Sequence, residues 1–204
     1  MGPAARVYLL SPARTGSPRA LQLAASASPL GEALRSPEGA ALGEVFAFLS
    51  SLYFRGKLAY ASRFGAQGLA VPGALVITPG HGLCRPSTRV TSGDLAAMSR
   101  VEVAADNPAF VQPLLRDATR LLQSTPSDAE FVLLGSIATP KYVAPLLSVL
   151  GPRLLFPREF VGRGDMSRGG LLLRAERAGT PLEYVPVHST ERSGPRARRI
   201  DSMS

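Results

Sequence analysis

The sequence predicts a three-layer α/β fold, in which a mostly parallel central sheet of about five strands carries helices on both faces. The first observation is a set of short apolar runs, at residues 6–10, 74–79, 130–136, 153–157 and 182–187. These runs lack polar alternation, which is typical of strands buried on both faces. The second observation is that segments with helical spacing separate most of the runs. Such alternation favours a parallel sheet with right-handed connections.

Four segments have the pattern of helices: residues 42–64, 107–123, 139–150, and a last helix that ends at Gly179. In the first helix, apolar side chains recur at spacings of three and four, and Gly56 is the expected break. Asn107 and Thr139 each precede a proline, which suits the cap and first turn of the next two helices. Asp165 or Ser167 is expected to cap the last helix.

The strands and helices are expected to form one domain, residues 1–187. A chain of 204 residues is long enough for a single core. Residues 11–41 are rich in Ala, Ser, Pro and Gly, and we expect a long loop or insertion there. Residues 188–204 are basic and polar, and they are predicted to be a tail that stays flexible until it meets a partner.

The charge balance favours a polyanionic partner. The chain has 23 Lys and Arg against 15 Asp and Glu, a formal charge of +8, and its only lysines are Lys57 and Lys141. Arginine presents a planar fork to phosphate, so a nucleic acid or nucleotide partner is expected. Codon usage in a GC-rich genome also produces arginine-rich chains, and charge alone leaves both explanations open.

Cysteine and histidine counts limit the other classes of function. The single Cys84 cannot form an internal disulfide, which favours a reducing compartment, and we expect a cytoplasmic protein. No apolar run approaches the roughly 18 residues of a membrane helix, so no membrane partner is expected. One cysteine and two histidines 107 residues apart predict no metal site. No cofactor is expected, because the dinucleotide pattern GxGxxG does not follow the first strand.

The loops that follow the strands are the expected place for a ligand, because parallel sheets bind ligands beyond the carboxyl ends of their strands. In one of them, His81 stands between Gly80 and Gly82, directly after a predicted strand. Glycines let a ligand approach the main chain, and histidine is suited to acid–base catalysis near neutral pH. The alternative is a turn whose histidine merely covers the edge of the sheet.

A second loop joins a predicted strand to a helix start at residues 135–141. Free amide groups and the helix dipole attract anions at such a start. Ser136 and Thr139 are candidate hydroxyl donors, and Lys141 is a candidate countercharge for phosphate. The spacing is not that of a Walker A loop. Ordinary helix capping explains the same residues without a ligand.

The third loop, GRGDMSRGG, enters the last helix. Its glycines, Gly164 among them, can expose amide groups, and Arg163 and Arg168 can bind a phosphate. Asp165 is then the candidate catalytic carboxylate beside His81. In the alternative interpretation, Asp165 only caps its helix and pairs with Arg168.

Four segments of the chain, YFRGKLAYASRFG, ALVITPGHGL, VLLGSIATPKYVAPLL and FVGRGDMSRGGLLLR, occur in an order that resembles an uncharacterised family of small bacterial and phage α/β proteins. The resemblance spans about residues 50–175. It implies a Rossmann-like core similar to that of uracil-DNA glycosylase and, by association, nucleobase chemistry. On the matching positions it implies function at His81, Gly82, Ser136 and the loop from Gly162 to Arg168. The first loop of the family usually contains a Cys-Ser-Lys type sequence, whereas this chain has Ser-Pro-Ala-Arg at 11–14.

We therefore expect a protein that binds nucleic acid or a nucleotide at the carboxyl edge of its sheet. If it is an enzyme, the expected reaction is metal-independent cleavage or exchange at a nucleobase N-glycosidic bond. The alternative is a non-catalytic protein that docks DNA, RNA or an acidic partner on its arginine-rich surface and tail. The tail arginines expected to follow a nucleic-acid backbone are Arg192, Arg196, Arg198 and Arg199.

Overall fold

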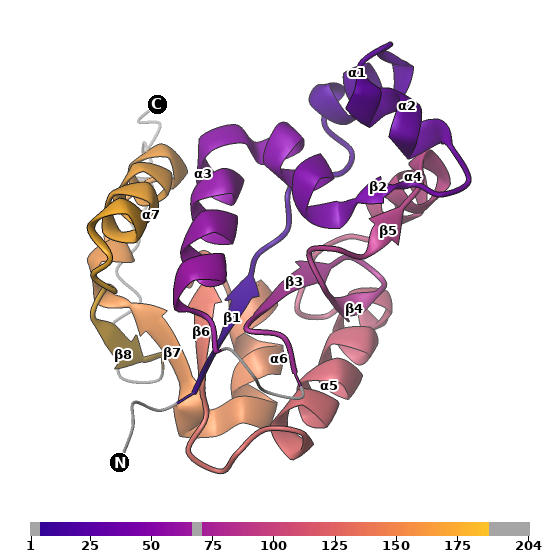
Figure 1. The fold of residues 1–204 in the computed structure, drawn as a ribbon. Coiled ribbons are helices and arrows are strands. Elements are labelled where there is room, and N and C mark those ends of the chain that lie inside the picture. The colour runs from indigo at the N-terminus through magenta and orange to yellow at the C-terminus, as the bar shows by residue number, and fades with distance from the viewer. Residues whose placement is uncertain (1–4, 67–70, 188–204) are drawn as a thin grey trace, which may run out of the picture.

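A six-stranded, mostly parallel sheet forms the centre of the protein. The computed structural model describes residues 5–66 and 71–187. The sheet has the order β4-β3-β1-β6-β7-β8 (Figure 1), formed by Gly82–Cys84, Ala74–Thr78, Arg6–Leu10, Glu130–Leu134, Leu154–Pro157 and Tyr184–Pro186. The four inner strands are parallel, and the edge strands β4 and β8 are antiparallel to their neighbours. The predicted α/β class is confirmed, with one strand more than the sequence indicates.

Helices cover both faces of this sheet, as expected. On one face lie α3 (Leu42–Phe64) and α7 (Asp165–Ala178), which pack against each other. On the other lie α5 (Pro108–Gln123) and α6 (Pro140–Leu150) (Figure 1). Single turns of 3-10 helix, Gly151–Arg153 and Arg158–Phe160, flank β7. Within the described residues, every helix is too short or too polar to span a lipid bilayer.

A group of short elements stands above the carboxyl edge of the sheet (Figure 1). It contains the helices α1 (Pro18–Ala25), α2 (Pro29–Arg35) and α4 (Ser92–Ser99). It also contains a two-stranded antiparallel pair, β2 (Ala40–Ala41) and β5 (Arg89–Val90). Residues 11–41, expected to be a long loop, therefore contain two helices and a strand. Both helices begin with a serine followed by a proline, a start signal like those of α5 and α6.

The helix ends agree with the sequence in part. Asn107 caps α5, since its side chain accepts a hydrogen bond from the Ala109 amide at 3.1 Å, and Gly179 ends α7 in the left-handed region. The cap of α7 is Gly164, with Asp165 as the first helical residue. The break in α3 lies at Ser51, with φ 50° and ψ −125°, and Gly56 is helical. The prediction of a break at Gly56 was wrong because that glycine serves helix packing.

Gly56 allows α3 and α7 to cross at very short range. A Cβ on Gly56 would lie 2.7 Å from the carbonyl oxygen of Gly169, and a Cβ on Gly169 would lie 2.9 Å from the carbonyl oxygen of Leu52. Such distances leave no room for a side chain on either helix. The crossing holds the first turn of α7 beside the part of α3 that follows the break.

We expect Gly169→Ala to lower the free energy of unfolding by about 1–3 kcal/mol, because the added methyl group meets the α3 backbone. Gly170→Ala is the matched control. A Cβ there would approach no closer than 3.4 Å, to Arg174 Nη1, and loss of a helical glycine stabilises by about 0.5–1 kcal/mol. Urea denaturation measures both, and equal destabilisation by the two variants would contradict the close crossing.

Candidate functional site

The candidate site lies at the carboxyl ends of β1 and β6, which are neighbours in the sheet. The connections that follow these two strands lead to opposite sides, from β1 towards β3 and from β6 towards β7. After β1 the chain reaches β3 on one side, and after β3 it crosses to β6 on the other. Such a switch point leaves a crevice at the carboxyl ends of the strands. The Ser11 amide donates to the Leu134 carbonyl at 3.2 Å. A Cβ on Gly135 would lie 2.9 Å from Ser11 Cβ, so only glycine permits this approach.

A cleft of about 390 Å³ opens at this point. Its lining carries one carboxylate, Asp165, against four basic side chains: Arg14, Arg19, Lys57 and Lys141. The hydroxyl groups in the lining belong to Ser11, Ser17, Ser50, Tyr53, Ser136 and Tyr142. A cleft with this excess of positive charge and hydroxyl donors favours an anionic ligand.

Three helices begin at the cleft. Ser17 is the N-cap of α1, Lys141 and Tyr142 lie in the first turn of α6, and Asp165 is the first residue of α7. The free amide groups and dipoles at helix starts attract negative charge. The positive ends of three helices therefore add to the charge of the basic side chains.

The Lys57 side chain is the innermost basic group of the cleft, with 1% of its surface exposed. Its Nζ donates to the Ser11 carbonyl at 2.7 Å and to Ser11 Oγ at 3.0 Å. The ring centroids of Tyr53 and Phe54 lie 4.4 and 4.9 Å from Nζ. Burial lowers the pKa of Lys57 to about 7, an effect that Asp165 opposes and Arg168 reinforces. The group therefore changes charge near neutral pH.

Two buried hydroxyl groups in the lining have no hydrogen-bond partner in the part of the chain that the structure describes. They are Tyr53 Oη, in a side chain with 5% of its surface exposed, and Ser17 Oγ. Burial raises the pKa of Tyr53, while the nearby Arg168 acts in the opposite direction. Unpartnered buried hydroxyls are costly in a folded protein and are characteristic of sites that a ligand completes.

The α3 backbone is strained beside the same cleft. Ser51 has a positive φ of 50°, a value that only glycine adopts without cost. Its neighbours Leu49, Ser50 and Tyr53 line the cleft. The break turns the chain so that Tyr53 and Lys57 face the cleft from the second part of the helix.

A second hollow, of about 510 Å³, lies on the other side of the loop after β1. The two hollows share Pro12, Ala13, Arg14, Lys141 and Tyr142. Met98, Val101 and Val103 make part of its wall apolar. A ligand longer than a phosphate group therefore has space on both sides of this loop.

Three residues predicted from the sequence meet in the cleft: Ser136, Lys141 and Asp165. Asp165 is 71% exposed and lies 3.8 Å from Arg168. Thr139 stands at the start of α6, exposed, and makes no capping hydrogen bond. Ser136 Oγ accepts from the Ala138 amide at 3.3 Å.

The arginines of the Gly-rich loop are engaged within the protein. The Arg168 guanidinium is buried and donates to the Phe160 carbonyl at 3.1 and 3.2 Å. Arg163 is exposed and donates to the Glu159 carbonyl at 2.8 Å and to Ser167 Oγ at 3.2 Å. In this arrangement Arg168 anchors the loop. Gly164 has open space around it.

His81 lies in the turn between β3 and β4 and does not line the cleft. Gly80 and Gly82 have φ values of 79° and 74°, which the turn requires. A Cβ on Gly82 would lie 2.1 Å from Asp117 Oδ2, so this glycine also permits β4 to pack on α5. Arg192, Arg196, Arg198 and Arg199 lie outside the described residues.

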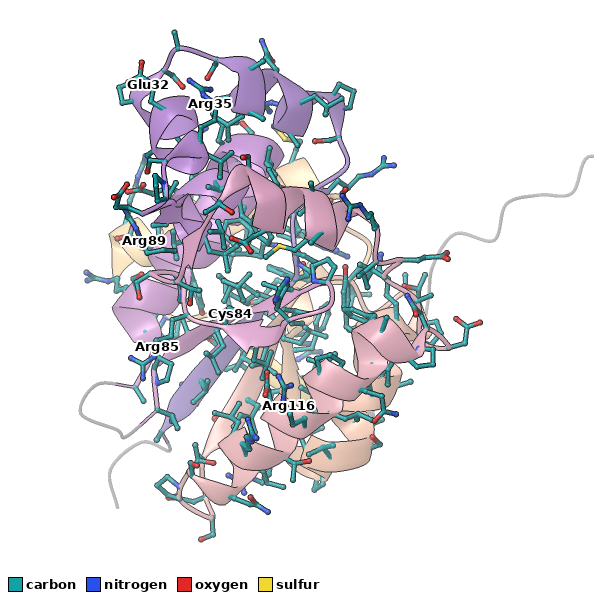
Figure 2. All side chains as sticks on the ribbon, turned by 90° about the vertical axis from the view of Figure 1, so that its right-hand side faces the viewer. Glu32, Arg35, Cys84, Arg85, Arg89 and Arg116 are labelled. Atoms are coloured by element: carbon teal, nitrogen blue, oxygen red, sulfur yellow. The ribbon has the colours of Figure 1, made fainter. Side chains whose placement is uncertain are left out.

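Arginine also gathers away from the cleft. Figure 2 shows Arg85, Arg89 and Arg116 around Cys84 on the face that carries β4, β5 and α5. Arg116 pairs with Asp117 at 2.7 Å, and Arg89 donates to the Glu38 carbonyl at 3.2 Å. Internal partners therefore occupy two of these three arginines. Within residues 5–66 and 71–187, no cluster of three His, Cys, Asp or Glu side chains is placed to hold a metal.

Comparison with protein-family models, curated proteins and solved structures finds no match to this chain. The function is therefore argued from the cleft itself. Sequence reasoning considered Tyr53 and Lys57 only as part of a basic aromatic helix face that could stack bases, and it did not select them or Arg14 as residues of this site. For Lys57 a signal was present, because it occupies a position of the apolar stripe of α3 between Tyr53 and Tyr60.

We expect the free energy of unfolding to rise from about pH 7.5 to 9.5 more steeply in the wild-type protein than in Lys57→Met. Between the folded pKa of about 7 and the ordinary 10.5, the unfolded chain binds more protons, so the difference grows with pH by up to about 1.4 kcal/mol per unit. Chemical denaturation at several pH values measures it. Parallel curves for the two proteins would contradict a buried amine that titrates near neutrality.

Proposed function

We propose that this protein binds a nucleotide or a nucleic-acid strand, with a phosphate group in the cleft at the switch point. One observation carries the proposal: basic side chains and three helix starts converge on a cleft that contains one carboxylate. Phosphate is the common biological anion that such a combination suits. The formal charge of +8 favours association with a polyanion.

The phosphate has three groups of partners in this proposal. Arg14 and Arg19 supply guanidinium groups from the chain after β1, and Lys141 supplies an ammonium from α6. Amides in the first turns of α1 and α6, together with the hydroxyls of Ser17 and Ser136, supply further donors. Ser17 Oγ, which has no partner within residues 5–66 and 71–187, gains one in this complex.

The second hollow suits the nucleoside part of the ligand. It adjoins the phosphate site across the loop after β1 and shares Lys141 and Tyr142 with it. Its apolar wall, to which Val101 and Val103 contribute, offers contact to the flat faces of a base. A phosphate in one hollow and a base in the other make a nucleotide the smallest ligand that uses both.

Asp165 is the residue of this cleft that fits an acid–base role. Its carboxylate is accessible, and it is the one carboxylate among the described residues that line the cleft. The N-glycosidic bond of a nucleotide is one that a carboxylate and a water molecule can cleave without a metal. The proposed reaction is therefore release of a nucleobase, with Asp165 activating water; His81 has no part in it.

A non-catalytic interaction protein is the second candidate, and the exposed arginines outside the cleft favour it. Arg85 is exposed on the face in Figure 2, beside Arg89 and Arg116. A surface of this kind binds nucleic acid or an acidic protein through charge alone. The two candidates differ in whether affinity depends on the cleft or on the total charge.

We expect Arg14→Ala and Lys141→Ala each to weaken binding of a fluorescein-labelled, 5′-phosphorylated oligonucleotide by about 10- to 100-fold, because each removes a charged hydrogen bond to phosphate. Arg177→Ala is the matched control, since it removes the same charge at the far end of α7. Fluorescence anisotropy at fixed salt measures the affinities. If all three variants weaken binding equally, the charge-only candidate replaces the cleft.

Asp165→Asn is expected to lower the rate of base release from the oligonucleotide by at least about 100-fold, a factor within the range of acid–base catalysis. The affinity for the oligonucleotide is expected to stay within a few-fold of the wild-type value. The substitution keeps the shape of the side chain while removing its basicity. Chromatographic detection of the free base under single-turnover conditions gives the rate. A variant that releases base at the wild-type rate, or a wild-type protein that releases none, would contradict the catalytic role.

A further inference from the structure

The amino group of Lys57 has no structural partner of opposite charge among the described residues. None of the ion pairs in residues 5–66 and 71–187 includes Lys57. Its two hydrogen bonds go to one residue, Ser11, through the backbone carbonyl and the hydroxyl oxygen. A buried lysine is rarely retained without a paired carboxylate, since an apolar residue fills the same volume at lower cost. The position therefore calls for a function of the amine itself.

The two hydrogen bonds of Lys57 are compatible with the neutral amine as well as with the ammonium. A neutral amine has two hydrogens, and the two Ser11 acceptors account for both. Its nitrogen lone pair then remains free. An ammonium would carry a third hydrogen, for which the faces of the Tyr53 and Phe54 rings are the neighbouring acceptors. An uncharged amine in a cleft is a nucleophile.

The charged and titratable groups around Lys57 come from α3, α6, α7 and the segment that runs from β1 into α1, which contributes Arg14 and Arg19 to the lining of the cleft. Helix α7 contributes Asp165, which favours the ammonium, and Arg168, which disfavours it. Tyr53 lies one turn away on α3, and Lys141 of α6 lines the same cleft. Desolvation outweighs the attraction of Asp165, and it lowers the pKa of Lys57 to about 7. A substantial fraction of the amine is thus unprotonated at neutral pH.

We propose that Lys57 is a nucleophile that forms an imine with the aldehyde of a sugar phosphate held in the cleft. The proposal rests on the proposed function for the phosphate group, which would hold the sugar beside the amine. The chemical class is an aldose phosphate whose ring opens to a free C1 aldehyde. Loss of the base from a nucleotide leaves a sugar of this class, so the imine step consumes the product of the proposed base release.

The step balances without an oxidant or a reductant. The Nζ lone pair attacks C1, and the carbonyl electron pair moves to oxygen, which takes up a proton to give a carbinolamine. The carbon–oxygen bond then breaks, the hydroxyl leaves as water with a second proton, and nitrogen loses its remaining protons to give the C=N bond. The net change is amine plus aldehyde to imine plus one water. Asp165, in the same cleft, is positioned to move these protons.

The test uses the full chain, 2-deoxyribose 5-phosphate as the probe, and sodium cyanoborohydride as the reductant. Hydride adds to the imine carbon and fixes the adduct as a secondary amine, which raises the protein mass by that of the probe less one oxygen atom. Because the chain has only two lysines, peptide mass spectrometry assigns the adduct without ambiguity. We expect it at Lys57, in at least tenfold excess over Lys141 and the N-terminal amine. Adducts spread evenly over the three amines, or none, would overturn the proposal.

Two further measurements separate this proposal from the proposed function. Lys57→Met removes the amine and forms no imine, and we expect it to lose the adduct at least tenfold. Mapping on the wild-type chain gives the same answer if the variant fails to fold. Binding of 2-deoxyribitol 5-phosphate, which has no aldehyde, reports the phosphate site alone by calorimetry. If this analogue binds but no Lys57 adduct forms, the nucleophile proposal fails and the phosphate-site proposal stands. If the analogue does not bind and no adduct forms, both proposals fail.

Discussion

The buried amine of Lys57 is the constraint on which the candidate site depends. The fall of its pKa from 10.5 to about 7 corresponds to about 5 kcal/mol against the charged form. The fold meets this cost by letting the amine lose its proton and by giving it two acceptors on Ser11. Because Ser11 directly follows β1, Lys57 also ties α3 to the point where the sheet changes direction.

Close backbone approaches hold the other walls of the cleft around this amine. Gly135 lets the chain after β6 pass against Ser11, and the crossing of Gly56 with Gly169 brings the first turn of α7 to α3. Together they put Asp165 and Ser136 in the same cleft as Lys57. The strained Ser51 turns α3 beside that cleft. Tight packing therefore surrounds a site in which two buried hydroxyl groups, Tyr53 Oη and Ser17 Oγ, have no partner among the described residues, the arrangement expected of a preorganised ligand site.

The layers of the fold could be predicted from the sequence because buried strands and helix starts leave local signals. The apolar run at residues 130–136 and the Asn-Pro pair that begins at 107 each indicate their element through a few consecutive residues. The cleft could be predicted only in part. Strand-end loops identified Ser136 and Asp165, but Lys57 lies mid-helix, and its burial follows from the approach of α7 and β1. From the sequence, Arg168 was a candidate to bind phosphate, but in the structure its guanidinium donates to the Phe160 carbonyl. That contact depends on how the loop closes.

Nuclear magnetic resonance of the lysine side chains tests the central claim most directly. With only two lysines in the chain, ¹³Cε-labelled lysine gives two signals, and the Lys57→Arg variant assigns them. The account predicts that the Lys57 signal titrates with a midpoint near pH 7. A midpoint at the ordinary lysine value of 10.5 would show a solvated ammonium and would contradict the buried amine on which the site is built.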